Sequence, residues 1–189
     1  MRIRDSSLAI IAALAACGGD DNQVTSGFPG VIINPVRSSI SAKVTFHDSN
    51  GGSHVQSVIA MTDAANLCTK ITANPAYFQT ATENFNSIIF WFPPDRVGTG
   101  IIGQSFPDGT AINTEVVLGS VSGASPILAK FGGVTNSGTI VITQFNTGPG
   151  GEAIGNFDVG VFDGNGVPRE MLGKFKAIYC QGMEQAQLP

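Results

Sequence analysis

The chain has 189 residues, a formal net charge of −4, 13% charged residues and 24 glycines. This length suits one domain with a hydrophobic core. The acidic, weakly charged composition argues against a nucleic-acid partner, because phosphate contacts need clustered Lys and Arg. Few charges, abundant glycine and many β-branched residues favour strands joined by tight turns.

The first sixteen residues have the pattern of a secretory signal peptide. Arg2 and Arg4 precede an unbroken apolar run from Leu8 to Ala16. The run has nine residues, whereas a spanning helix needs about twenty. A basic start, a brief apolar run and small residues before the cleavage point predict export and removal of residues 1–16.

The end of this run, Leu14-Ala15-Ala16-Cys17, resembles the lipobox of bacterial lipoproteins. The resemblance implies cleavage before Cys17, a diacylglyceryl group on its thiol and acylation of its new amine. Two or more acyl chains hold a protein stably on a membrane, so the membrane is the expected partner. In such proteins an Asp directly after the cysteine commonly causes retention at the inner membrane. Residue 18 here is Gly, which favours the outer membrane but does not indicate whether the domain faces the periplasm or the cell surface. An ordinary secretory peptide with a chance cysteine is the alternative.

Composition divides the remaining chain in two. We expect residues 17–39, which are rich in Gly, Asp and Pro, to comprise the lipidated cysteine and a flexible tether. We expect residues 40–189 to form a single β-sandwich domain.

A predicted β-hairpin carries the sharpest candidate for metal binding. Residues 41–47 and 54–59 alternate between apolar and polar and flank Asn50-Gly51, the strongest short hairpin signal. A two-residue turn there would pair His47 with His54 on one face. Cross-strand Cβ atoms lie about 4.5–5.5 Å apart, within reach of a shared zinc or copper ion. No third ligand is evident, so two exposed polar residues near a hairpin tip are the alternative.

Residues 63–73 break the alternation and predict one short helix, with Leu67 and Ile71 on its buried face. Besides Cys17, the chain has Cys68 on this helix and Cys180 near its end. An exported protein permits oxidation, so we expect these two cysteines to form a disulfide, with two buried free thiols as the alternative. The bridge would close a loop of 112 positions and contribute about 4–5 kcal/mol in the chain-entropy model.

Short strand-like segments recur along the rest of the chain, separated mostly by Gly, Pro, Asn or Asp. They cover residues 87–92, 110–118, 127–131, 138–145, 153–162 and 172–180. Together with the hairpin they predict an all-β fold, an antiparallel β-sandwich of about eight strands of jelly-roll or immunoglobulin-like type.

A Gly-x-Phe pattern occurs in each of the last two predicted strands, at Gly155 and Phe157 and again at Gly173 and Phe175. With the closing cysteine it resembles the C-terminal edge of many secreted β-sandwich lipoprotein domains. We expect the glycines to let a neighbouring ring or strand approach closely, and the phenylalanines to fill the core.

Other candidate sites are weaker. Trp91 is a candidate for lining a sugar or peptide groove, although a strand buried on both faces explains it equally well. The segment from Asp163 to Gly166 partly resembles a calcium loop but lacks further ligands, so we expect a turn and no calcium. No Gly-x-Ser-x-Gly motif occurs, and no spacing selects a pair of carboxylates. We therefore expect no catalytic residues and no cofactor.

Three classes of function follow. The first is a non-catalytic, membrane-anchored envelope lipoprotein that binds a protein partner or supports an assembly. The second is a ligand-binding module, for a metal at His47 and His54 or for a glycan or peptide near Trp91. The third is a hydrolase of unknown type, which needs carboxylates that converge in a cleft.

Overall fold

The computed structural model describes residues 21–28, 33–47, 52–94, 96–101, 113–122, 125–133, 137–163 and 165–186. The signal peptide and Cys17 lie outside these ranges. The described residues form ten strands and three short helices. The strands are β1 (Gln23–Ser26), β2 (Ser38–His47), β3 (Ser53–Thr62), β4 (Phe85–Phe92), β5 (Gly98–Ile101), β6 (Asn113–Ser122), β7 (Ser125–Gly133), β8 (Ser137–Phe145), β9 (Glu152–Phe162) and β10 (Pro168–Tyr179). The helices are α1 (Leu67–Ala73), α2 (Tyr77–Thr80) and the 3₁₀ helix η1 (Met183–Gln185).

All ten strands belong to one mixed sheet, in the order β5-β8-β9-β10-β2-β3-β4-β6-β7, with β1 added to β10. The β10–β2 pair is parallel, and the other pairs are antiparallel. The prediction of an all-β fold is confirmed. The predicted sandwich of jelly-roll or immunoglobulin-like type is not, because the described strands form one sheet, and they number ten instead of about eight.

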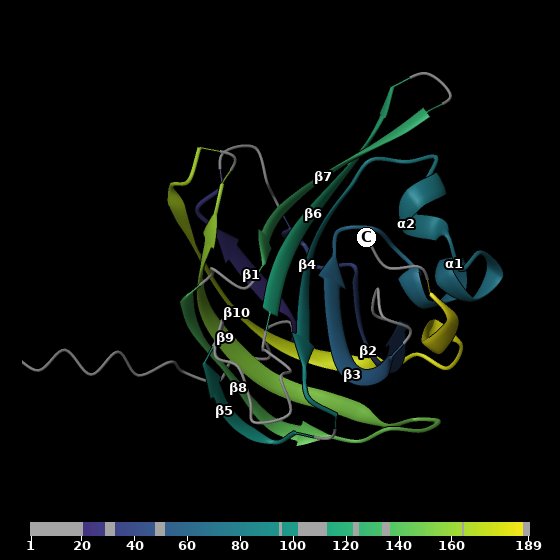
Figure 1. Ribbon diagram of the computed structural model, residues 1–189, viewed down its shortest axis with the longest axis vertical. Helices are drawn as coiled ribbons and strands as arrows, with labels where there is room; N and C mark the ends of the chain where they lie inside the picture. Colours follow the sequence, from purple (N-terminus) through teal and green to yellow (C-terminus); the bar gives the residue numbers. More distant parts are fainter. Residues whose placement is uncertain are drawn as a thin grey trace, which may run out of the picture.

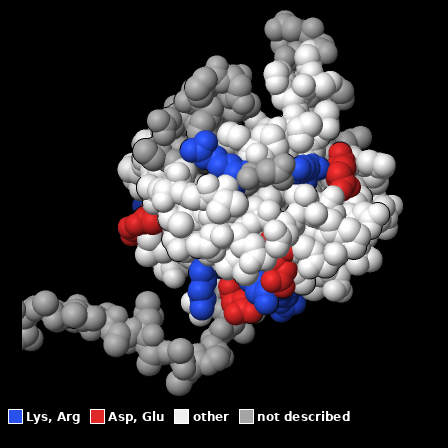
Figure 2. Space-filling view, turned by 90° about the horizontal axis from the view of Figure 1, so that it is seen from below, with Lys and Arg blue, Asp and Glu red and all other residues white. Residues whose placement is uncertain are grey.

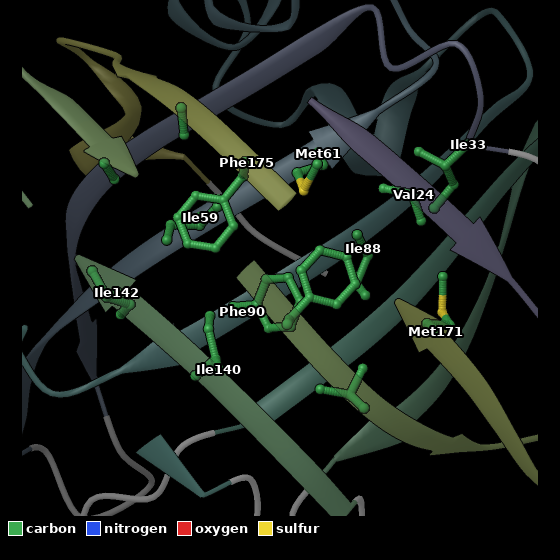
Figure 3. Close-up of a cluster of buried hydrophobic side chains, with 14 of the residues drawn as sticks. Val24, Ile33, Ile59, Met61, Ile88, Phe90, Ile140, Ile142, Met171 and Phe175 are labelled. Carbon is green, nitrogen blue, oxygen red and sulfur yellow. The ribbon is translucent and has the colours of Figure 1, made fainter. Parts of the chain in front are cut away.

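The sheet curls on itself, so that β4 faces β8 and β9 across a shared core (Figure 1). The rings of Phe90 and Phe157 lie 4.8 Å apart between centroids, and those of Phe92 and Phe145 lie 5.4 Å apart. Figure 3 shows side chains from β1, β3, β4, β8 and β10 converging inside this curl. The curl therefore buries the apolar inner face of the sheet without a second, separate sheet.

The two Gly-x-Phe patterns interlock on this inner face. Gly155 pairs with Phe175 and Gly173 pairs with Phe157 across β9 and β10. A Cβ atom at either glycine would lie 2.5 Å from the ring of its partner, closer than real Cβ contacts. The expectation that these glycines let a neighbouring ring approach closely is confirmed.

The helices pack on the outer face of β2, β3 and β4 (Figure 1). They cover a second apolar cluster that includes Ile40, Val58 and Ile89. Helix α1 begins at Leu67, after Asn66 in the left-handed conformation, and Leu67 and Ile71 are fully buried as predicted. Helix α2 was not predicted. In the part of the chain that the structure describes, no helix is long and apolar enough to cross a membrane.

The disulfide joins Cys68 in α1 to Cys180, which directly follows β10. The two Cα atoms lie 5.5 Å apart, within the usual range for a bridge. The predicted pairing is confirmed, and it ties the helical layer to the end of the last strand.

The folded part begins earlier than predicted. The expected tether ran to residue 39, but β1 lies within it and pairs with β10. Val24, Phe28 and Ile33 are buried in the inner core. This segment joins the fold because its few apolar side chains find a place inside the curl. Asp21, the first described residue, lies four residues after Cys17 in the sequence.

Candidate functional site

The outer face of the sheet is covered only in part. The helices lie over β2, β3 and β4, while the outer face of β5, β8, β9 and β10 has no helix among the described residues (Figure 1). Thr99, Val141 and Asn156 lie side by side on this face, since each pairs directly with the next. Figure 2 views the molecule from the side where β5, β8 and β9 lie and shows wide areas without charged residues. We call this surface the uncovered wall.

A groove of about 360 Å³ opens where the helical layer ends. One side is formed by α1 at Leu67, Cys68 and Thr69, and the other by Lys176 and Ile178 of β10. The start of β2 also lines it. The groove therefore lies between the covered part of the sheet and the uncovered wall, directly beside the disulfide.

Strand pairing explains why the groove exists. Strands β1 and β2 use the same edge of β10, one after the other: β1 pairs with residues 171–174 and β2 with Ile178 and Tyr179. Between these two stretches of β10, Asn22 takes the place of a strand partner: its side-chain oxygen accepts a hydrogen bond of 2.8 Å from the backbone N–H of Lys176. The groove occupies the place where β1 has ended and β2 has not yet joined the ladder.

The described chain enters the fold at this groove. Asn22 lines it, and the Asp21 carboxylate lies 3.8 Å from the Lys176 ammonium. The same ammonium lies 3.3 Å from the carboxylate of Glu152. The charge of Lys176 is thus shared between two acidic side chains.

Charged and apolar groups stand together around the groove. Arg37 lines it, and within the described ranges its guanidinium has no ion pair or hydrogen bond. Ile178 is 59% exposed, the largest exposure among the large apolar residues of the described chain. Leu172, also on β10, is 38% exposed. Ile178 therefore gives the groove one exposed apolar side chain.

Arg37 also lines a second hollow, together with Glu83, which belongs to a polar network. The Glu83 carboxylate accepts hydrogen bonds from the Lys70 ammonium and from the Tyr77 hydroxyl, and these bonds lower the pKa of Glu83. Burial, followed by the hydrogen bond to Glu83, raises the pKa of Tyr77. The network fixes α1 and α2 against the loop before β4, and its groups are engaged with one another.

Tyr179, which also lines the groove, is held in a similar way. Its hydroxyl donates to the Glu184 carboxylate, and this bond with burial raises the pKa of Tyr179 to about 12. A tyrosine with such a pKa stays protonated near neutral pH. The single proton of the Tyr179 hydroxyl is thus already donated to Glu184. What the groove offers a ligand is the Arg37 guanidinium.

No family model, curated protein or solved structure matches this chain. The function is therefore inferred from the groove, the uncovered wall and the position of the N-terminal segment beside them.

The predicted register of the hairpin is wrong by one residue. His47 pairs with Ser53, and His54 pairs with Phe46. Five residues separate β2 from β3, whereas the prediction assumed a two-residue turn, and a shift of one residue moves a side chain to the other face. The two histidines therefore do not share a face, which removes the basis of the metal prediction. Among the described residues, no three His, Cys, Asp or Glu side chains are grouped to hold a metal ion.

The structure also places the weaker candidates. Trp91 is 6% exposed and packs in the outer core cluster, so its ring does not line an exposed groove. The Asp163 carboxylate accepts hydrogen bonds from the backbone N–H groups of Asn165 and Val167 and from the Arg169 guanidinium. These bonds, led by that from Val167, lower the pKa of Asp163. The segment has the contacts of a turn, as predicted.

Sequence reasoning missed the groove residues Arg37, Lys176 and Ile178. They are far apart in the chain, and only the sharing of the β10 edge by β1 and β2 brings them together. No local pattern signals such an arrangement.

Proposed function

We propose that this chain is an exported bacterial lipoprotein, anchored by lipid on Cys17, with a non-catalytic binding or structural role in the cell envelope. The sequence Leu14-Ala15-Ala16-Cys17, which resembles a lipobox, carries the proposal. Asp21 links the proposed anchor to the groove. It lies four residues after Cys17 and beside the groove. Four residues span at most about 14 Å, so a lipid on Cys17 would hold this side of the domain close to the membrane. The outer membrane is favoured by Gly18.

We propose that the uncovered wall contacts a protein partner in the envelope. On β5 and β8 the outer positions Thr99, Thr139 and Val141 of the wall are uncharged. On β9 and β10 the acidic and basic side chains nearly balance, and they are Glu152, Asp158, Glu170, Lys174 and Lys176. Such a surface suits another neutral protein face better than a polyanion.

For the fold, we propose that the two facing halves of the curled sheet are the counterpart of the two layers of a β-sandwich.

Removal of the lipidated thiol tests the anchor. Cells that express the wild type or Cys17→Ser are fed an alkyne-tagged fatty acid and then fractionated. The wild type should carry the tag and sediment with membranes, whereas the variant should lose the tag and become soluble. The double variant Cys68→Ala/Cys180→Ala is the control and should keep the tag. A Cys17→Ser protein that stays on the membrane, or an untagged wild type, would contradict the proposal.

The partner surface is tested separately with a photo-crosslinking amino acid at Thr99 or Thr139 on the wall. Both positions are exposed and should give the same crosslinked product in cells. A crosslinker at Val55, which is 45% exposed and lies on β3, is the control. Equal products from all three positions, or none from the wall, would count against a partner at this surface.

A further inference from the structure

We propose that the groove beside the N-terminal segment binds the head group of an anionic phospholipid in the membrane that carries the anchor. The inference rests on the proposed function, because lipid on Cys17 is what brings the groove to the bilayer. It adds a second, reversible contact with the same membrane.

Position is the first argument. Asn22 lines the groove and Asp21 is paired with Lys176, which also lines it. The chain leading to Cys17 therefore starts at the groove itself, and the head groups around the anchor lie within the reach of about 14 Å given by four residues. A groove on the far side of the domain would not meet them.

Charge is the second argument. Arg37 has no ion pair within the described part of the chain, and its planar guanidinium can bind two oxygens of one phosphate. Lys176 lines the same groove, but its charge is shared between Asp21 and Glu152. The whole chain is acidic, so no general attraction draws it to anionic lipids. Preference for such lipids must arise locally, and Arg37 is the group that supplies it.

Apolar surface is the third argument. Ile40 and Leu67 line the groove but are buried in the outer core cluster. The apolar surface open to a ligand comes from the partly buried Val36 and from Ile178, which is 59% exposed. A phospholipid presents a phosphate next to its glycerol backbone and acyl chains. The groove has a volume of about 360 Å³. Like a phospholipid, which places its phosphate next to apolar chains, the groove has a cation and apolar side chains in its lining.

The test uses the full mature chain with Cys17→Ser, so that no anchor masks the weaker contact. Binding is measured by co-sedimentation with phosphatidylcholine vesicles, with or without phosphatidylglycerol. Short-chain phosphatidylglycerol below its micelle concentration and inorganic phosphate are titrated separately. We expect binding to phosphatidylglycerol vesicles and to the short-chain lipid, and little to phosphatidylcholine or phosphate.

Two substitutions address the two kinds of contact. Arg37→Gln should weaken binding to phosphatidylglycerol vesicles about five-fold, the effect of one basic residue at an anionic surface. Ile178→Ser should weaken binding to the vesicles more than binding to the short-chain lipid. Lys43→Gln and Val55→Ser are the matched controls, because residues 43 and 55 lie toward the far end of the β2–β3 hairpin from the groove. Equal thermal unfolding midpoints confirm that all variants are folded, and Arg37→Lys should retain part of the binding.

Several results would overturn the inference. Equal affinity for inorganic phosphate would mean a simple anion site, and equal binding to both kinds of vesicle would mean no head-group preference. A loss with Lys43→Gln as large as that with Arg37→Gln would mean a diffuse charge effect. The proposed function fails in a different way, if Cys17→Ser stays membrane-bound in cells or the wild type carries no lipid.

Discussion

Replacement of Gly173 by Ala tests whether the interlocked Gly–Phe pairs hold the curled sheet in place. The new Cβ would lie 2.5 Å from the ring of Phe157 and closer still to the backbone oxygen of Gln23 in β1. The ring can shift slightly, but the backbone oxygen moves only if β1 moves. Overpacking of a core costs about 1–3 kcal/mol. Because one contact here is with backbone, we expect the upper end, about 3 kcal/mol.

Gly160→Ala is the matched control on the neighbouring strand. Its Cβ would lie 2.9 Å from the Ser137 hydroxyl, the end of a side chain that can rotate away, and at an ordinary contact distance of 4.0 Å from the Pro168 side chain. Replacement of a glycine also restricts the unfolded chain, which stabilises by about 0.4–1 kcal/mol where the backbone permits alanine. We expect the free energy of unfolding of Gly160→Ala to stay within about 0.5 kcal/mol of the wild type.

Urea unfolding followed by the fluorescence of Trp91 measures both variants. Trp91 is the single tryptophan of the chain and is buried, so its emission reports loss of the core. For a protein of this size, about 3 kcal/mol corresponds to a fall of roughly 6–12 °C in Tm. A Gly173→Ala protein as stable as Gly160→Ala would refute the reasoning. Complete rescue by adding Phe157→Leu would show that the ring, and not the contact with β1, decides the cost.

Two further predictions concern the helical layer. Reduction of the disulfide, or its removal by Cys68→Ala/Cys180→Ala, should lower the free energy of unfolding by about 2–5 kcal/mol, because it frees a loop of 112 positions; a denaturation curve unchanged by reductant would contradict this. Hydrogen bonds from Lys70 and Tyr77 lower the pKa of Glu83 in the folded protein. The ionised Glu83 carboxylate therefore stabilises the fold above the unfolded-state pKa, and this stabilisation is lost as the pH falls through the lower folded-state pKa. Glu83→Gln should therefore flatten the acid side of a stability–pH profile, and an unchanged slope between pH values of about 5 and 2 would contradict the assignment.

Local patterns were sufficient for the features that depend on neighbours in sequence. The spacing of Leu67 and Ile71 predicted the buried side of α1, although not its start, because the chain passes through a left-handed Asn66 first. The predicted helix began at residue 63, but Asp63 lies outside α1 and accepts hydrogen bonds from the backbone and side chain of Asn86. The Gly-x-Phe pattern predicted close approach because its period of two matches the pleat of a strand.

Features that depend on distant pairing were missed or misplaced. The register of the β2–β3 hairpin depends on the length of its connection, and one residue decides whether His47 and His54 share a face. Strand β1 has only four residues and no clear alternation, so only its pairing with β10 reveals it. The groove at Arg37 depends in turn on where β1 ends. Burial of Trp91 followed from the helical layer, whose extent the sequence left open.

Mass spectrometry of the N-terminal peptide from the membrane-bound protein tests the central claim most directly. The account predicts a peptide that begins at Cys17 and carries the combined mass of a diacylglyceryl group and an amide-linked acyl chain. Alkaline treatment should remove the ester-linked chains and leave the amide-linked one. A mature protein that begins at another residue, or an unmodified Cys17 in the membrane fraction, would contradict the account.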